Sequence, residues 1–317
     1  MAASINEVRN TVLAIANKNN YGYISPQDFN LYAKQAQIDM FEDYFYQYNN
    51  WINKENNRTS GTGYADIVKN LVEVIDSFST QVFLTQNNAN TFNLPNDYYL
   101  INKLFYYSTP LFKGVNDGVS ANQLLDSTGP GWNPIPTSSP TPPIGSLVVN
   151  TTNLTQAYVT GVPNATTLDL SADIFGGIGE GYTIYSSTKI KEVERVSQSK
   201  IFYLTNSMLT APTKSYPAYV LDGNIVTVYP STILNAGDIQ SQYIRYPLDP
   251  KWTFQILVGG EPLFDATAVG FQDFELPESD EPTLVAKICQ YIGIEIREEM
   301  VYQFGGTQET IETQETS

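Results

Sequence analysis

Ser25-Pro26-Gln27-Asp28-Phe29-Asn30 opens the stretch of sequence that decides the fold, and an aromatic-rich run continues from it to Trp51. A serine oxygen at a helix N-terminus accepts a hydrogen bond from a backbone amide that has no partner inside the helix. Proline fits the first helical position, and an acid in the first turn faces the positive end of the helix dipole. The sequence therefore predicts a long helix over residues 26–51.

Large apolar side chains recur along this helix at steps of three and four residues and form two neighbouring stripes. A helix with two apolar faces needs two packing partners, and we expect one of them to lie in another subunit. The residues expected at such an interface are Phe29, Tyr32, Met40, Phe41, Tyr44, Phe45, Tyr48 and Trp51.

The composition is that of an acidic globular protein. The chain has 317 residues, of which 42% are hydrophobic, and it carries 33 acids against 17 bases for a net charge of -16. Such a balance argues against a large surface that neutralises nucleic-acid phosphates. The 22 tyrosines suit interfaces that are partly buried and partly wet.

The inventory of reactive side chains is poor. There is no histidine, so nucleophile pairs that depend on histidine are absent, and so is the commonest zinc ligand. Cys289 is the single cysteine, and its apolar helical surroundings predict a buried thiol. We expect no catalytic residues, no cofactor and no metal, and hence not an enzyme. Residues 1–10 lack the apolar core of a secretory signal, and no apolar run has the length of a membrane helix, so we expect synthesis in a reducing cytosol and no membrane partner.

The whole chain predicts an α+β fold with an N-terminal helical layer, an antiparallel β domain that carries an inserted β-rich subdomain, and a C-terminal helix. The expected parts are a helical layer over 1–79, a β core over 80–110 and 188–278, the insertion with a Pro-rich linker over 111–187, a helix over 279–304, and a polar tail over 305–317. The tail should be disordered in the isolated chain.

Local signals refine this division. Ser4 and Glu7 form a capping box at the first helix. Asp222-Gly223 between apolar strands predicts a two-residue hairpin turn, because both positions tolerate positive φ. Asn87-Asn88 predicts a short hairpin between flanking strands at 81–84 and 91–94. Residues 191–204 fit either a helix or a strand.

Two clusters suggest chemistry at first sight. Gly176-Gly177-Ile178-Gly179-Glu180-Gly181 is glycine-rich like a phosphate cradle, but neither the lysine nor the helix of such a site follows it, so we interpret it as a flexible loop. A set of carboxylates could supply the acid and base of a glycosidase or ligate calcium. We favour a structural role at a helix N-terminus for this set, which consists of Asp273, Glu275, Glu278, Asp280 and Glu281.

Aromatic and basic residues offer two further candidates. Trp132, Trp252 and Tyr243 could form a sugar-stacking platform, although packing is the simpler interpretation. The densest basic positions interleave with Glu192 and Glu194, which favours an ion-paired surface over a DNA-binding stripe. These positions are Lys189, Lys191, Arg195 and Lys200.

Several short motifs follow one another along the chain in a recognisable order. They are Asn17-Lys18-Asn19-Asn20-Tyr21-Gly22-Tyr23-Ile24-Ser25-Pro26-Gln27-Asp28-Phe29-Asn30 with Ala36-Gln37, Leu94-Pro95-Asn96-Asp97-Tyr98, Tyr243-Ile244-Arg245-Tyr246-Pro247 with Pro250-Lys251-Trp252, and Asp273-Phe274-Glu275-Leu276-Pro277. Their order resembles that of tail-associated structural proteins of crAss-like and related bacteriophages and, more distantly, of head–tail connector and tail tubular proteins of short-tailed phages. The insertion over 111–187 has no counterpart in this resemblance.

The resemblance implies a structural virion protein, made in the host bacterial cytoplasm, that forms a homo-oligomeric ring of twelve subunits in the tail or neck below the portal. Genomic DNA and ejected proteins would pass through the lumen without sequence-specific binding, and neighbouring ring, portal and tail proteins would dock on the ring. It implies no catalytic residues. Two alternatives stay open, namely a receptor- or glycan-binding tail protein that uses the insertion, and a carbohydrate-active enzyme that uses the region of Asp273 and Glu275.

Overall fold

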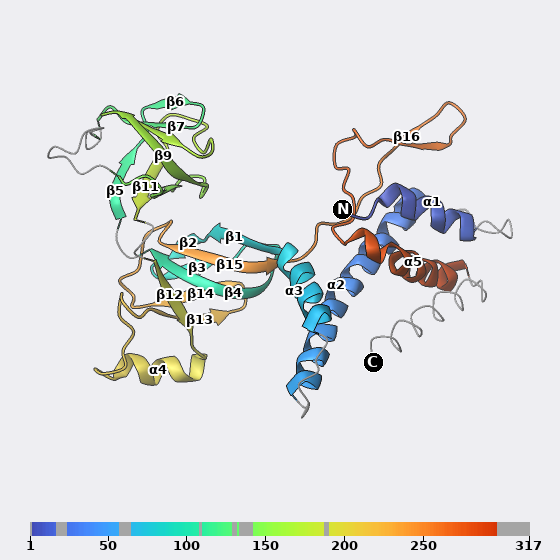
Figure 1. The fold of residues 1–317 in the computed structure, drawn as a ribbon, viewed down its shortest axis with the longest axis horizontal. Helices are drawn as coiled ribbons and strands as arrows, with labels where there is room; N and C mark the ends of the chain where they lie inside the picture. The colour runs from blue at the N-terminus through green and yellow to red at the C-terminus, as the bar shows by residue number, and fades with distance from the viewer. Residues whose placement is uncertain are drawn as a thin grey trace. The chain divides into compact units, whose positions relative to one another are not determined.

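A computed structural model describes residues 2–16, 24–56, 65–107, 110–128, 132, 142–186 and 190–296 (Figure 1). The chain divides into unit 1, which comprises Met1–Phe78 and Tyr246–Ser317, and unit 2, which comprises Ser79–Arg245. Unit 1 is mainly helical and unit 2 is built on β-sheets, which confirms the α+β class. The tail over 305–317, most of the Pro-rich linker and the end of the C-terminal helix lie outside the described residues. None of the described helices has the length and apolarity to span a membrane.

The long helix α2 (Pro26–Asn56) begins where the sequence predicts. The backbone N–H of Asp28 donates a hydrogen bond to Oγ of Ser25 at 3.1 Å, and the Ser25 hydroxyl donates to the Asp28 carboxylate. Ser25 thus satisfies a backbone donor that the first helical turn leaves without a partner. The predicted helix start is confirmed.

The described part of unit 1 contains four further helical elements. They are α1 (Ile5–Ala16), α3 (Ala65–Ser77), α5 (Glu281–Ile296) and the short 3-10 helix η2 (Glu278–Asp280). Helix α2 packs against α3 and α5, and α1 packs against α5. The buried side chains of these helices include Ile5, Val8, Val12, Phe29, Ala33, Met40, Phe41, Leu284, Ile288 and Ile292.

Cys289 lies in α5 and is buried, as the sequence predicts. Burial raises the pKa of its thiol to about 11. At neutral pH the group is therefore almost wholly protonated, and a protonated thiol is a poor nucleophile.

The segment after β15 departs from the expected division. Residues 246–278 belong to unit 1 with the helices, whereas the sequence placed them in the β core. Their regular structure includes the two-stranded antiparallel hairpin of β16 (Phe254–Ile256) and β17 (Pro262–Phe264). The reason for the difference is that Trp252 is hydrogen-bonded to residues of α1 and α2, as described below.

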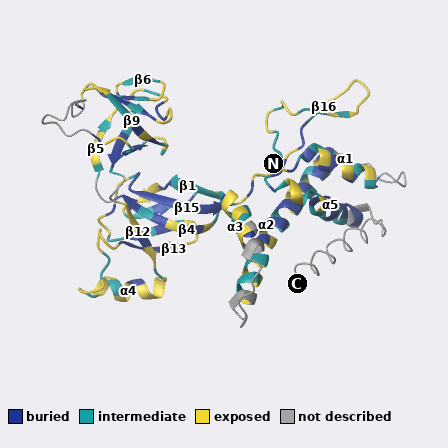
Figure 2. Cartoon of the chain, viewed as in Figure 1, coloured by how far each residue is buried: buried dark blue, intermediate teal, exposed yellow. Residues whose placement is uncertain are grey.

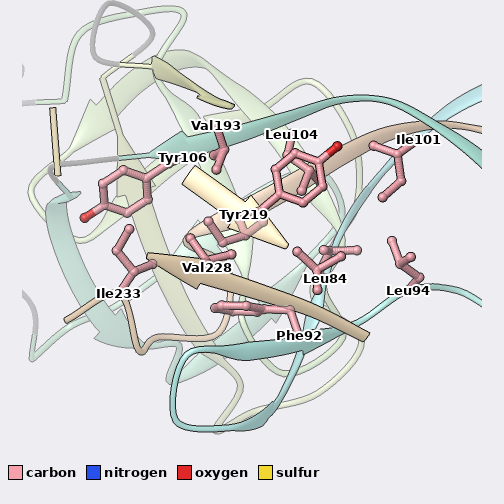
Figure 3. Close-up of a cluster of buried hydrophobic side chains, with 12 residues drawn as sticks. Leu84, Phe92, Leu94, Ile101, Leu104, Tyr106, Val193, Tyr219, Val228 and Ile233 are labelled. Carbon is pink, nitrogen blue, oxygen red and sulfur yellow. The ribbon is translucent and has the colours of Figure 1, made fainter. Parts of the chain in front are cut away.

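Unit 2 contains an eight-stranded sheet whose hydrophobic core is drawn in Figure 3. All neighbouring strands are antiparallel except β12 and β13, which run parallel and are joined through α4 (Gln198–Asn206). The ambiguous stretch 191–204 therefore contains both a strand and a helix. In sheet order the strands are β1 (Ser79–Phe83), β15 (Ile239–Arg245), β4 (Tyr98–Tyr107), β12 (Ile190–Arg195), β13 (Ala218–Asp222), β14 (Ile225–Tyr229), β3 (Thr91–Asn93) and β2 (Thr85–Asn88).

Two hairpin predictions need correction. Asp222 pairs with Ile225, so the turn consists of Gly223 and Asn224, one residue later than expected. Gly223 alone of these two has positive φ, at 58°, which places glycine at the first central position as in a type II′ turn. The strand at 81–84 is not part of the first hairpin, because β1 pairs with β15 and the hairpin is formed by β2 and β3.

The inserted segment between β4 and β12 forms a seven-stranded antiparallel sheet with its own core. This core includes Phe112, Leu124, Trp132, Val148 and Ile184. In sheet order the strands are β5 (Pro110–Val115), β11 (Gly181–Tyr185), β8 (Leu147–Asn150), β9 (Gln156–Asn164), β10 (Thr167–Leu170), β7 (Gln123–Leu125) and β6 (Gly118–Ser120).

The two sheets of unit 2 meet at a buried polar contact. The Tyr185 hydroxyl, from the insertion, donates to Oδ1 of Asp238 at 2.9 Å. Nε2 of Gln240 donates to Oε1 of Gln156 at 2.9 Å, and the Tyr107 hydroxyl donates to Oε1 of Gln240 at 2.7 Å. Because buried polar groups lose their hydration, these hydrogen bonds hold the insertion in one defined position on the core sheet.

Asp238 gives this contact a pH dependence. Burial raises its carboxyl pKa above the ordinary value of 3.8, although hydrogen bonds from Asn235 and Tyr185 partly oppose the rise. A folded-state pKa above the unfolded value means that the associated stability is complete at low pH and is lost as pH rises through the raised pKa. We therefore expect wild type to lose stability relative to Asp238→Asn as pH rises from about 3.8. Urea denaturation of both proteins at a series of pH values measures the difference, and a difference that is constant with pH would contradict the prediction.

Candidate functional site

Half of the eight residues expected at an intersubunit interface are buried within the chain itself. Phe29, Met40, Phe41 and Tyr44 each expose 8% of their surface or less. The Tyr44 hydroxyl donates to the carboxylate of Asp280. These four side chains form part of the core of unit 1, so the expectation that they face another copy is wrong for them.

The other four α2 residues are partly exposed. Tyr32 stacks on Tyr291 of α5, with ring centroids 6.2 Å apart, and Phe45 packs edge-on against Phe41 at 5.1 Å. Tyr48 and Trp51 are also of intermediate exposure. Part of the packing partner that we expected in another subunit is therefore α5 of the same chain.

Two of the carboxylates considered as a catalytic or calcium-binding set, Asp273 and Glu275, join segments of unit 1. Oδ1 of Asp273 accepts a hydrogen bond from the Ile5 N–H at 2.9 Å and so caps α1 from a distant part of the chain. Oε2 of Glu275 accepts one from the Leu248 N–H at 2.7 Å. Among the described residues, no group of three or more acidic, cysteine or histidine side chains is placed to hold a metal ion.

Gln37 of α2 is hydrogen-bonded to two parts of the segment over residues 246–278. It is buried, with Nε2 donating to the Leu248 carbonyl at 2.7 Å and Oε1 accepting from the Glu275 N–H at 3.0 Å.

Replacing Gln37 with methionine keeps the side-chain length but removes both hydrogen bonds, and we expect a loss of about 1–3 kcal/mol in the free energy of unfolding. Urea denaturation followed by circular dichroism measures it. Gln35→Met, at an exposed position two residues away, is the control and should change stability by less than about 0.5 kcal/mol; equal effects would contradict the prediction.

The aromatic residues considered for sugar stacking are not available to a ligand. Trp132, Trp252 and Tyr243 expose 0%, 2% and 4% of their surfaces. Tyr243 also donates its hydroxyl hydrogen bond to Asp97 at 3.0 Å. A stacking platform needs an open ring face, so burial contradicts the platform alternative for all three and confirms the favoured interpretation that they are packing residues.

The glycine-rich loop is tied to the buried residue Asn116. The backbone N–H of Glu180 donates to Oδ1 of Asn116 at 2.7 Å, and the N–H of Gly179 donates to its carbonyl at 2.9 Å. Two amides that a phosphate cradle would need are thus already bonded within the protein.

Among the basic positions, Lys191 and Lys200 are exposed, while Lys189 lies outside the described residues. The neighbouring Glu192 pairs with Lys103 at 3.3 Å.

The first surface that sequence analysis missed is the α4 lobe, defined as residues 197–217. Figure 2 shows α4 as largely exposed. In this lobe Ile201 is buried against the sheet residues Ala218 and Val220 and holds the helix in place. The large side chains that the lobe exposes are Phe202, Tyr203, Met208, Leu209 and Tyr216, with exposed fractions between 66% and 102%.

The second surface is the β16–β17 arm, defined as residues 252–265. Its base is Trp252, whose ring stacks on Phe254 and Phe264 at 5.6 and 5.8 Å. Its tip is a turn in which the N–H of Gly260 donates to the Leu257 carbonyl at 2.8 Å. The large apolar side chains that it exposes are Ile256, Leu257, Val258 and Leu263, with exposed fractions between 48% and 111%.

The arm is anchored to the helices of unit 1. Nε1 of Trp252 donates to Oδ1 of Asn6 at 3.1 Å, and the guanidinium carbon of Arg9 lies 3.8 Å above the Trp252 ring. The Trp252 N–H donates to Oδ1 of Asn30 at 2.8 Å, and Nδ2 of Asn30 donates back to the Trp252 carbonyl at 3.2 Å. One signal in the sequence could have revealed the arm, since aliphatic residues directly before Gly259-Gly260 fall in a turn, where they are exposed.

Both surfaces expose several large apolar side chains, a feature typical of sites that bind another macromolecule. Comparison of the sequence with models of known protein families and with curated proteins found no match.

Proposed function

We propose that this chain is a structural virion protein that assembles into a ring of twelve subunits in the tail or neck of a bacteriophage, below the portal. In that position the ring would be a conduit for DNA and ejected proteins and a docking surface for neighbouring tail proteins. The observation that carries the proposal is that each unit presents its own exposed apolar surface, the α4 lobe on unit 2 and the β16–β17 arm on unit 1. The motif order that resembles phage tail proteins supports the same conclusion.

Two different surfaces on one chain suit a ring. A ring is built from heterologous contacts, in which each subunit uses one surface toward one neighbour and another surface toward the next. The net charge of -16 suits a conduit, because an acidic wall repels DNA phosphates and keeps the genome from adhering.

The three aromatic residues considered as a platform for the glycan-binding alternative are buried, which counts against that alternative. The acids of the carbohydrate-active alternative hold α1 and the segment around Leu248 in place. We therefore make the ring the single proposed function.

Light scattering coupled to size exclusion, together with negative-stain images of the purified chain, tests the proposal. We expect closed rings of uniform diameter, and the same protein in purified phage particles. A monomer at every concentration and salt condition, combined with absence of the protein from particles, would overturn it.

A further inference from the structure

We propose that the α4 lobe of one copy binds the β16–β17 arm of another copy of this chain. This inference rests on the proposed function and names the contact that would build the ring. The following observations lead to it: the apolar character of both surfaces, the firm anchoring of the arm, and their opposite charge.

The apolar character provides the driving force. On the lobe, Phe202 and Tyr203 are adjacent in α4 with ring centroids 5.9 Å apart, and Met208 and Leu209 follow in the next turn, almost fully exposed. Aromatic residues and methionine are enriched in protein interfaces, where they fill pockets and adapt to the partner. Exposed side chains of this size gathered on one helix and the turn after it are unfavourable in water unless a partner covers them.

The arm is held in position before any partner arrives. An isolated two-stranded hairpin is only marginally stable, but this hairpin is fixed at its base by the stacking on Trp252 and by the hydrogen bonds of Trp252 to Asn6 and Asn30. An element that is already ordered loses less conformational entropy on binding. Its exposed tip, Leu257 and Val258, is therefore suited to insert between the large side chains of the lobe.

The charges of the two surfaces favour binding of the lobe to the arm of a second copy. The lobe carries Lys200 and Lys214 and no acid, in a chain that has almost twice as many acids as bases. The arm carries Glu261 and Asp265 and no base. Two copies of so acidic a chain repel each other, so contact is favoured where a locally basic surface meets an acidic one. Burial raises the pKa of Asp238, and the charge of Lys214 partly opposes that rise. Because Lys214 therefore also acts within its own chain, Lys200 is the better residue to test.

The contact is heterologous, because the lobe and the arm are different surfaces. Each copy bound through its lobe still presents its arm, and each copy bound through its arm still presents its lobe. Such a contact repeats until the rotation between copies closes a ring.

Cross-linking between two variants tests this contact. One preparation carries Met208→Cys and the other Val258→Cys, and the two are mixed and treated with a short bis-maleimide. We expect a cross-linked dimer in the mixture and little in either variant alone, because lobe would not meet lobe and arm would not meet arm. Wild type is the control, since its one thiol, Cys289, is buried with a pKa of about 11. Absence of a cross-link in the mixture would overturn the inference.

Charge reversal gives a second measurement on the full chain. Lys200→Glu or Glu261→Lys alone should weaken association about three- to tenfold at low salt, because each places like charges opposite one another. The double variant should recover most of the loss. Lys191→Glu, at an exposed position on β12 outside the lobe, is the matched control and should have a smaller effect. Sedimentation measures the association, and equal effects of the control and the two lobe–arm variants would contradict the proposed contact.

The outcomes separate this inference from the proposed function. Rings in wild type without the cross-link would refute the lobe–arm contact and leave the ring. A cross-linked dimer that never gives rings and is missing from particles would support the contact and refute the ring. If neither rings nor the cross-link appear and the protein is missing from particles, both proposals are wrong.

Discussion

Replacing Trp252 with alanine is expected to lower the free energy of unfolding of unit 1 by about 3–5 kcal/mol, the usual range for removing a large buried aromatic side chain. Trp252 exposes 2% of its surface and stacks on two phenylalanines. Its indole N–H also donates to Asn6. The substitution therefore leaves a cavity and removes the hydrogen bond that joins the base of the arm to α1.

Urea denaturation followed by the helical circular dichroism signal measures this loss. Trp252→Phe is the matched control, because it keeps an aromatic ring at the base of the arm and removes the indole N–H. We expect Trp252→Phe to recover more than half of the stability lost in Trp252→Ala. A loss below about 1 kcal/mol in the alanine variant, which is typical of surface positions, would mean that Trp252 does not hold unit 1 together.

The start of α2 could be predicted because its cause is local. Ser25 and Asp28 are three residues apart, and the hydrogen bond between them depends only on the first turn of the helix. The burial of Cys289 was predicted for a similar reason, since its neighbours in α5 repeat at helical spacing. The existence of the Asp222 hairpin was also local, but its exact turn depended on the pairing of Asp222 with Ile225.

The partners of α2 could not be predicted, because they come from far along the chain. Tyr32 contacts Tyr291, Gln37 bonds to Leu248, and each pair is separated by more than 200 residues. Hydrophobic spacing shows that a face is buried, but it does not show which element covers it. Spacing alone therefore cannot distinguish a second subunit from α5, which covers part of the apolar face of α2.

The α4 lobe and the β16–β17 arm could not be predicted, because apolar residues that are exposed look the same in the sequence as apolar residues that are buried. Phe202 and Val258 read as ordinary apolar residues, which usually face the core. Only the fold shows that α4 uses Ile201 to pack on the sheet and leaves its neighbours exposed. Exposure is a property of the tertiary arrangement, so the functional surfaces depend on the structure more than the helix positions do.

Phe41 provides the sharpest distinction between a core residue and an interface residue on α2. Its ring contacts Phe45 and Phe78, each at 5.1 Å and edge-on, and it exposes none of its surface. We expect Phe41→Ala to lower the free energy of unfolding by about 3–5 kcal/mol even in a dilute, unassembled sample. A residue that packed only against another copy would show no such loss at low concentration, because its partner would be absent.

The matched control for Phe41→Ala is Tyr46→Ala on the same helix, where 65% of the side chain is exposed. Its effect on the free energy of unfolding should stay within about 0.5 kcal/mol. Both variants are measured by urea denaturation over a range of protein concentrations. A loss in Phe41→Ala that grew with protein concentration would show that Phe41 contacts another copy, because only a contact between copies depends on concentration. A loss that is constant with concentration would place Phe41 in the core, where its ring contacts Phe45 of α2, Phe78 directly after α3 and Tyr246 directly after β15.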